Sequence, residues 1–390
     1  MAGGILKRSM FGLCMGILPA LPLSRLPATD RESFRAQSPP PRTQNVILVT
    51  LDGVRWQDLF GGMDSTIAAV DSNSGIWDTL RVRRRYWRPT VDERRRALMP
   101  FFWDSLVPQG LLLGNRTLNS PVNTRNPHWF SAPGYLEILT GQFQPEVTTN
   151  DDRRYDHATV LQFVQAKLGL NDRQVAAVTS WENFHSYVSS RPGLFYVNAG
   201  YEGVPDEVAL GPEFREVSRN AMRTISLDES SRNDGATGAV ALAYLRTWRP
   251  RLMYVSFGET DDWAHQRRYD LVLDDLHALD DWFHELWTTL QGTPAYRGST
   301  TLIITTDHGR GRTPRDWTDH GDDVAGAGEI WLAVIGPDTP RTGEGRDTPQ
   351  AFQADIAATL LQFFGLDVKE FNPEAGRAVA GTFAPPMAVK

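Results

Sequence analysis

The chain carries acidic and imidazole side chains at spacings typical of metal ligands. Asp307 and His308 are adjacent, so an oxygen and a nitrogen on one turn can bind the same ion from two directions. Asp261 and His265 are four residues apart, which places both side chains on one face if a helical turn begins at Asp261. Each pair alone also fits a bland alternative, such as a capping Asp near an unrelated His. Together they indicate a divalent-metal site.

Two further polar residues fit the same chemistry. Asp52 directly follows an apolar run and precedes Gly53. A carboxylate at the end of a buried strand is costly unless it is paired or binds a metal, although Asp-Gly is also a frequent turn. His320 lies in a polar loop beside Gly321, where a lone histidine is usually just exposed. We interpret both as candidate ligands because they accompany the two pairs.

Short apolar runs rich in β-branched residues must position these side chains. They predict buried strands over residues 46–51, 175–178, 252–257, 302–306 and 330–335. Three-four spacing of apolar residues predicts helices over residues 160–168, 276–290 and 352–360. This alternation predicts an α/β fold with a mostly parallel central sheet between helices. Asp52, Asp261 and Asp307 follow three of the strands, so we expect them at the carboxyl edge of the sheet, where such sheets bind ligands.

Composition narrows the class of protein. Hydrophobic residues make up 41% and charged residues 22% of the chain, so we expect a packed globular fold and no extensive disorder. The formal net charge of -7 argues against a nucleic-acid scaffold, which would concentrate Lys and Arg on one face. The Arg-rich segment 81–96 is the local exception. It is typical of a solvated helix face, and attraction of an anionic substrate is the alternative.

The N-terminal residues are typical of an export signal. Lys7 and Arg8 precede a mostly apolar run over residues 10–23, which is shorter than the about 20 residues of a transmembrane helix. We predict a signal peptide over 1–28, a linker over 29–44 and one folded domain over 45–390, with 62–110 as a possible insertion. The expected location is periplasmic or extracellular. The only cysteine, Cys14, lies in the signal, so the mature chain would hold no disulfide or thiolate metal site.

The order of these motifs resembles the alkaline phosphatase superfamily, in its nucleotide pyrophosphatase/phosphodiesterase-like (type I phosphodiesterase) branch. Members of that branch place a Thr or Ser two residues before a Pro and nine before a Thr-Gly pair. Ser131 stands at these spacings from Pro133 and Thr140. The resemblance covers residues 45 to 336 and implies a metal-dependent phosphoric ester hydrolase.

The resemblance also implies two divalent ions in one site. Their ligands would be Asp52, Ser131, Asp307 and His308 for one ion, and Asp261, His265 and His320 for the other. Imidazoles with carboxylates suit zinc best, and manganese is the alternative. Two such ions would bind the entering and leaving oxygens of a reacting phosphate ester.

Ser131 is the implied nucleophile. A serine hydroxyl reacts poorly at neutral pH, but binding to a divalent ion lowers its pKa and orients it for in-line attack. The expected cycle passes through a covalent phospho-Ser131 intermediate, and a structural role at a helix N-terminus is compatible with it. Eukaryotic phosphodiesterases of this branch usually carry a Thr at the position of Ser131. Because Ser keeps the hydroxyl, this difference affects the choice of substrate more than the chemistry. Asn150, downstream, is a candidate for binding a phosphoryl oxygen, and a plain turn residue is the alternative.

The expected substrate is a small-molecule or nucleotide-like phosphate ester, most plausibly a diester. Sulfatases of the superfamily carry Arg at the fifth position of the nucleophile motif, where this chain has Tyr135, so sulfate esters are less favoured. A phosphomonoesterase or a phosphomutase relative is the alternative. Monoesterases of the superfamily bind the phosphate dianion with an Arg near the nucleophile, and Arg125 is close to Ser131 in sequence but has no assigned role. The non-enzyme alternative is an exported binding protein, which the complete ligand set opposes.

Overall fold

The computed structural model describes residues 41–69, 74–203, 211–227 and 229–384. The predicted signal peptide over 1–28, with Cys14, lies outside these residues, as does the predicted linker except for its last four positions. Within the described ranges, no helix combines the length and the apolar character that crossing a bilayer requires.

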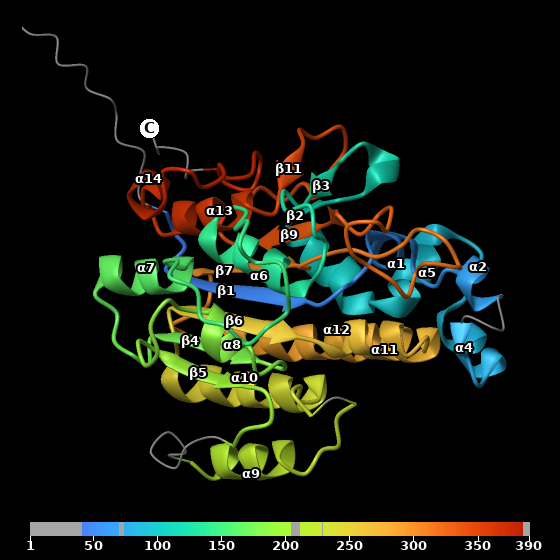
Figure 1. Ribbon diagram of the computed structural model, residues 1–390, viewed down its shortest axis with the longest axis horizontal. Coiled ribbons are helices and arrows are strands. Elements are labelled where there is room, and N and C mark those ends of the chain that lie inside the picture. Colours follow the sequence, from blue (N-terminus) through green and yellow to red (C-terminus); the bar gives the residue numbers. More distant parts are fainter. Residues whose placement is uncertain (1–40, 70–73, 204–210, 228, 385–390) are drawn as a thin grey trace, which may run out of the picture. The chain divides into compact units, whose positions relative to one another are not determined.

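An eight-stranded sheet lies at the centre of the described chain (Figure 1). Its strand order is β10-β2-β9-β7-β1-β6-β4-β5. The bounds are β1 (Asn45–Leu51), β2 (Gly110–Leu113), β4 (Val175–Thr179), β5 (Tyr196–Ala199), β6 (Leu252–Phe257), β7 (Thr300–Thr305), β9 (Leu332–Ile335) and β10 (Gly343–Glu344). Strand β9 is antiparallel to β2 and β7, whereas the other pairings are parallel. The predicted mostly parallel α/β fold is confirmed.

A three-stranded sheet corrects one predicted element. It consists of β11 (Ala351–Phe352), β3 (Val122–Asn123) and β8 (Glu329–Ile330). The apolar run 330–335, predicted as one strand, is therefore divided between β8 and β9. Trp331 separates them; it is fully buried, and its indole donates a hydrogen bond to the Val54 carbonyl at 3.0 Å. An apolar run does not reveal where a chain changes strand partners.

Helices cover both faces of the main sheet. One face carries α6 (Ser131–Thr140), α7 (Val160–Leu168), α8 (Phe184–Tyr187), α13 (Asp355–Phe363) and α14 (Val368–Phe371). The other carries α1 (Trp56–Gly61), α2 (Ser65–Ala68), α4 (Thr79–Tyr86), α5 (Val91–Leu98), α9 (Pro212–Ala221), α10 (Asp234–Trp248), α11 (Glu259–His265) and α12 (Tyr269–Gly292). Short helical turns are η1 (Phe102–Leu106), η2 (Val107–Gln109) and η3 (Arg116–Leu118).

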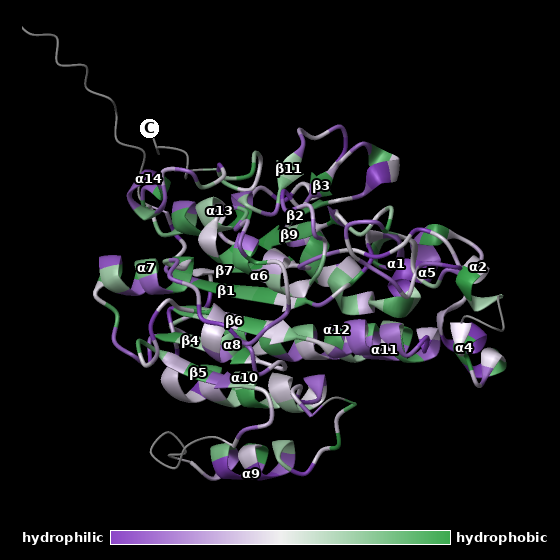
Figure 2. Cartoon of the chain, in the orientation of Figure 1, coloured by the Kyte–Doolittle hydropathy of each residue, from purple (hydrophilic) through white to green (hydrophobic). Residues whose placement is uncertain are grey.

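The central strands are buried on both sides because side chains alternate between two cores. Along β1, Ile47, Val49 and Leu51 pack into one apolar cluster. Val46 and Leu48 pack into the other. Figure 2 shows β1 and β6 as hydrophobic strands between helices of mixed character. Continuous apolar strands of this kind are typical of a covered, mostly parallel sheet.

The Arg-rich segment lies on α4 and α5 between β1 and β2. Arg81 and Arg85 pair with Asp274 of α12, while Arg95 and Arg96 pair with Asp92. Four arginines of this segment therefore form salt bridges with nearby carboxylates, as expected for a solvated helix face. These helices fall within residues 62–110, whose status as an insertion stays a prediction.

Candidate active site

Three neighbouring strands end at the same edge of the sheet and deliver the predicted acidic residues there. Strand β1 lies between β6 and β7, with Leu51 opposite Phe257 and Thr50 opposite Thr305. Asp52 follows β1 directly, Asp307 follows β7, and Asp261 lies in the helix α11 that starts just after β6. The register of parallel strands thus explains why residues far apart in sequence meet.

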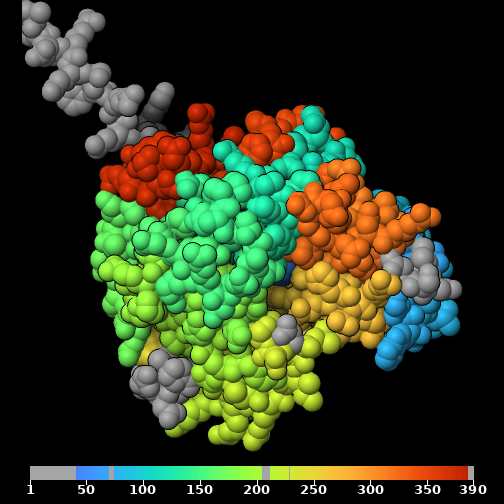
Figure 3. All heavy atoms as spheres, viewed as in Figure 1, coloured from blue at the N-terminus to red at the C-terminus, as the bar shows by residue number. Residues whose placement is uncertain are grey.

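A cavity opens at this edge. Figure 3 shows a hollow where the green, yellow and orange segments meet. The cavity has a volume of about 570 Å³. Its lining consists of Asp52, Ser131, Asn150, Asp152, Trp181, Asn183, Ser230, Ser231, Gly258, Asp261, Asp262, His265 and His320. Asp307 and His308 do not line it, because both are fully buried. All eight predicted site residues therefore lie in or beside one cavity.

The first group of candidate ligands surrounds the His308 ring. Its Nε2 lies 3.2 Å from Asp52 Oδ1, 3.4 Å from Asp307 Oδ2 and 3.5 Å from Ser131 Oγ. The other ring nitrogen, Nδ1, lies 2.9 Å from the Gly309 carbonyl oxygen, which places a proton on Nδ1. In the neutral ring, Nε2 then presents a lone pair to the carboxylates.

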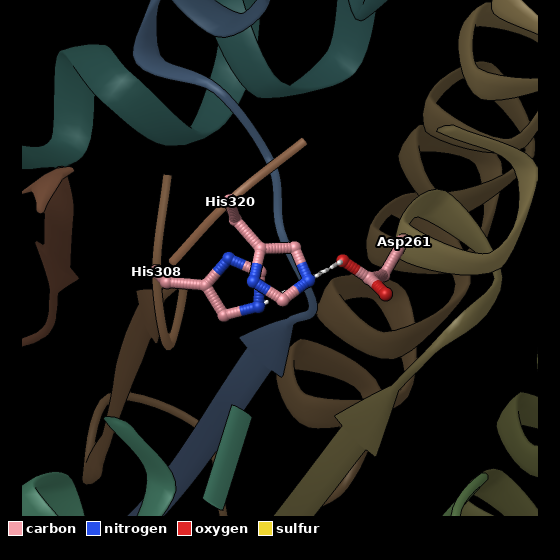
Figure 4. Close-up of side chains that lie close together, drawn as sticks. All are labelled: Asp261, His308 and His320. Carbon is pink, nitrogen blue, oxygen red and sulfur yellow. Dashed lines mark ion pairs between the residues drawn. The ribbon is translucent and has the colours of Figure 1, made fainter. Parts of the chain in front are cut away.

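The second group joins α11 to the loop after β7. His265 Nε2 lies 3.1 Å from Asp261 Oδ2 and 3.0 Å from His320 Nε2. Asp261 Oδ1 lies 3.8 Å from His320 Nε2 and 3.7 Å from His308 Nε2. Figure 4 shows Asp261, His308 and His320 pointing toward one another from separate segments, so the two groups meet at Asp261.

These donors fit divalent metal binding. Asp52 Oδ1 and Asp307 Oδ2 are buried without a hydrogen-bond donor among the described residues. Asp52, Asp307 and His308 each offer a ligand atom within 4.8 Å of the other two, and buried carboxylates in such a cluster need a cation to offset their burial. The ligand atoms of a tetrahedral ion bound at about 2.0 Å lie about 3.3 Å apart. The separations of 3.2 and 3.4 Å around His308 are of that size.

The pKa values shift in opposite directions within this cluster. Burial, together with the negative charge of Asp52, raises the pKa of Asp307 well above its ordinary value. Burial lowers the pKa of His308, but the Asp307 and Asp52 carboxylates outweigh it and raise the pKa to about 9. Burial and the charge of His308 lower the pKa of His265 and His320. Such opposed shifts of clustered groups are typical of a functional site.

Ser131 is the first residue of α6. Pro133 follows in the first turn, where its missing N–H leaves no donor unsatisfied. The amide of Ala132 donates to Asn150 Oδ1 at 2.9 Å, so Asn150 caps the helix that carries Ser131. Asn150 also lines the cavity, and the sequence alone gave it only a weak assignment.

The segment before Ser131 holds a backbone outlier. Trp129 has a φ of 51°, a left-handed conformation that is unusual for a bulky residue. Its carbonyl accepts a hydrogen bond of 3.1 Å from Gly321 N, next to His320. The loop of His320 is thus fastened to the segment that leads into Ser131. Strain of this kind is often found where a site fixes its geometry.

Two residues that lie at the site, Tyr135 and Arg310, were not identified from the sequence as site residues. Tyr135 Oη donates to Asp52 Oδ2 at 2.8 Å. Its position four residues after Ser131, on the same helix face, was the available signal. Arg310 is fully buried and pairs with Asp261; burial lowers its pKa to about 9. No spacing rule identifies Arg310, because its partners come from distant segments.

The sequence matches the family described as type I phosphodiesterase/nucleotide pyrophosphatase over residues 77–345. The chain belongs to this family. The predicted branch is therefore confirmed, and the protein is a hydrolase of the alkaline phosphatase superfamily acting on phosphate esters. A comparison with curated proteins finds no significant match.

Solved structures share the fold at low sequence identity. A phosphonate monoester hydrolase from Silicibacter pomeroyi is 13% identical with a TM-score of 0.54, covering 89% of this chain and 78% of its own. Murine ectonucleotide pyrophosphatase/phosphodiesterase 5, an inactive variant in complex with AMP, is 12% identical with a TM-score of 0.50, covering 83% and 96%. A 2-O GAG sulfatase is 14% identical with a TM-score of 0.53, covering 87% and 74%. At these identities the comparison supports the fold alone.

Proposed function

We propose that this hydrolase cleaves phosphate diesters, with Ser131 as the nucleophile and two divalent ions in the site. The observation that carries the proposal is the lining of the cavity beside Ser131. Among the described residues, that lining includes no Lys or Arg. It consists of five of the predicted metal ligands, together with two amides, two further hydroxyls, an indole, Gly258 and two further carboxylates, Asp152 and Asp262.

Because no Lys or Arg lines the cavity among the residues that the structure describes, the lining favours diesters over monoesters. A phosphate monoester has a dianionic group that enzymes commonly bind with an arginine fork. Arg125 is the arginine nearest to Ser131 in sequence, but it pairs with Asp355 at 3.5 Å and stacks on the Phe352 ring. A diester carries a single negative charge, so bound ions and neutral donors are enough to bind it.

The ligand groups suit two ions. Asp52, Ser131, Asp307 and His308 would hold one, and Asp261, His265 and His320 the other, with zinc as the leading candidate and manganese as the alternative. When bound, these ions would lower the pKa of the nucleophile and neutralise charge that develops on phosphorus and on the leaving oxygen.

Residues of the chain itself provide the nucleophile and stabilise negative charge on the reacting phosphate. The Ser131 hydroxyl gives up its proton as Oγ forms a bond to phosphorus, while the ester bond to the leaving oxygen breaks and that oxygen takes up a proton to leave as an alcohol. Water then hydrolyses the phospho-Ser131 ester, which releases a phosphate monoester and restores the Ser131 hydroxyl. The N-terminus of α6 favours negative charge at this point through its helix dipole. Asn150 Oδ1 is engaged by Ala132 N, which leaves the side-chain NH₂ as a donor to a phosphoryl oxygen.

The leaving group would lie against Trp181 and Asn183, which line the cavity after β4. An indole can stack on a flat leaving group such as a base or an aryl ring. The murine relative's complex with AMP makes a nucleotide-like ester a reasonable substrate to test.

We also propose that the protein is exported to the periplasm or the extracellular space. The support is the sequence of residues 1–28, in which Lys7 and Arg8 precede the apolar run. Fractionation of expressing cells, with N-terminal sequencing of the mature protein, tests this proposal. A cytosolic protein with an intact N-terminus would contradict it.

Three chromogenic esters test the proposed reaction. We expect the metal-loaded protein to hydrolyse bis-p-nitrophenyl phosphate faster than p-nitrophenyl phosphate, and p-nitrophenyl sulfate slowest. Ser131→Ala should lower kcat by about 10³-fold or more while both ions stay bound. Ser299→Ala, at the opposite end of the sheet, should leave kcat unchanged. A preference for the monoester would indicate a phosphomonoesterase, and no turnover of any ester would favour a binding protein.

A further inference from the structure

Arg310 is a buried guanidinium that no step of the proposed reaction uses. It follows His308 by two residues, and its side chain is 1% exposed. Nη1 donates to the Thr318 carbonyl oxygen, and Nη2 donates to the backbone and the carboxylate of Asp261. Burying a charged group is costly unless it is paired and hydrogen-bonded. These contacts offset that cost at Nη1 and Nη2, whereas Nε has no hydrogen-bond partner among the described residues.

The contacts of Arg310 connect three of the segments that carry predicted metal ligands: the turn of Asp307 and His308, α11, and the loop of His320. Its backbone belongs to the turn of Asp307 and His308. Its side chain binds Asp261 in α11, and it binds Thr318 two residues before His320. A parallel backbone bond supports this link, because Gly311 N donates to the Asp319 carbonyl at 3.0 Å.

The pairing also fixes the rotation of the Asp261 carboxylate. Oδ1 contacts Arg310, so Oδ2 faces His265 at 3.1 Å. Gly53 leaves the space for this arrangement. A Cβ there would lie 2.6 Å from Asp261 Oδ1 and 2.9 Å from Arg310 Nε. The Arg310–Asp261 pair therefore packs directly against the turn that carries Asp52.

We propose that Arg310 is a positioning residue that holds Asp261 and His320 in register with His308, and so preorganises the second group of metal ligands. A guanidinium suits this role because its planar fork can bond two partners in fixed directions. A lysine ammonium on a flexible chain would keep the charge but not the fixed geometry. The proposal rests on the assignment of Asp261, His265 and His320 as ligands of one ion.

Two arginine variants separate charge from geometry. Metal content per chain, measured on purified protein, should fall from two ions to one in Arg310→Gln, with at least about 10-fold weaker affinity for the second ion. Arg310→Lys should recover only part of that affinity. We expect kcat to fall in both variants with little change in KM, because the substrate contacts remain.

Arg251→Gln is the matched control. Arg251 also donates two guanidinium bonds to a backbone carbonyl, that of Gln44, but it lies at the start of β6, away from the site. This variant should keep two ions and its kcat. If Arg310→Gln does not fold, the folded Arg310→Lys protein decides the question. Wild-type metal affinity and kcat in a folded Arg310 variant would overturn the proposal.

Hydrogen exchange of the metal-free protein tests the same role without metal or turnover. Arg310→Gln should accelerate exchange in residues 311–321 and 259–265, and Arg251→Gln should not. Unchanged exchange in both segments would reject the positioning role. A wild-type protein that binds no divalent ion would instead reject the proposed function, and the exchange result would still decide on Arg310.

Discussion

Tyr135 connects the nucleophile's helix to the acidic ligand that follows β1. Its hydroxyl donates to Asp52 Oδ2, and its side chain is almost fully buried. Asp52 Oδ1 is then free to face His308 Nε2 at 3.2 Å. Tyr135, which stands where the sulfatases of the superfamily carry an Arg, thus orients a candidate metal ligand.

Removal of the Tyr135 hydroxyl should therefore weaken the site more than the fold. Tyr135→Phe leaves Asp52 Oδ2 without its donor, and loss of such a bond to a metal ligand typically costs 10–100-fold in metal affinity or activity, so we expect kcat to fall by about 10-fold or more. Steady-state kinetics and metal titration measure both effects.

Tyr296→Phe is the matched control for this substitution. Tyr296 is equally buried, and its hydroxyl donates to the Pro250 carbonyl at 3.0 Å, near the start of β6. Both variants should lose about 1 kcal/mol of stability, but only Tyr135→Phe should lose activity. Equal kcat in the two variants would remove Tyr135 from the site.

At the scale of elements, α6 packs directly against the end of β7. A Cβ added at Gly134 would lie 2.3 Å from the Asp307 carbonyl oxygen. This close approach places the first turn of α6, with Ser131, beside the turn that carries Asp307 and His308. The glycine thus sets the distance between the nucleophile and its predicted ligand partners.

Gly134→Ala should separate these two elements. The added methyl meets backbone atoms that cannot move aside, and overpacking of this kind typically costs about 1–3 kcal/mol. We expect a lower melting temperature and a fall in kcat, because Ser131 moves away from His308. Gly292→Ala, at the end of α12 with no atom within 4 Å of the added Cβ, should be neutral or slightly stabilising. Wild-type kcat in Gly134→Ala would show that the close packing does not position Ser131.

The strand ends were the part of the site that the sequence could predict. Asp52 and Asp307 follow apolar runs directly, and the carboxyl ends of neighbouring parallel strands must meet at one edge. Ser131 and His320 depended on the family resemblance, because their segments have no period that fixes their place. The bond between Trp129 O and Gly321 N joins those segments, and no local pattern predicts a contact across that many residues.

At the scale of the whole molecule, buried charge links metal binding to stability. Asp52 and Asp307 are buried within one cluster with His308. Burial and the charge of Asp52 raise the folded-state pKa of Asp307 well above its ordinary value. A group with a raised pKa contributes stability at low pH that is lost as pH rises through the folded pKa. The metal-free protein should therefore lose stability from Asp307 as the solution becomes alkaline, and bound cations should offset that loss.

Removal of metal should thus lower the melting temperature, and more so at alkaline than at mildly acidic pH. An ion present at 100 times its Kd stabilises the fold by about 2.7 kcal/mol per site. Scanning calorimetry of chelated and zinc-reloaded protein across pH measures the difference. Asp307→Asn removes one of the repelling charges, so its chelated form should lose less stability with rising pH, whereas Ser131→Ala should keep the wild-type dependence. Identical melting curves with and without chelator would contradict a metal-coupled cluster, since buried carboxylates that need no cation gain nothing from one.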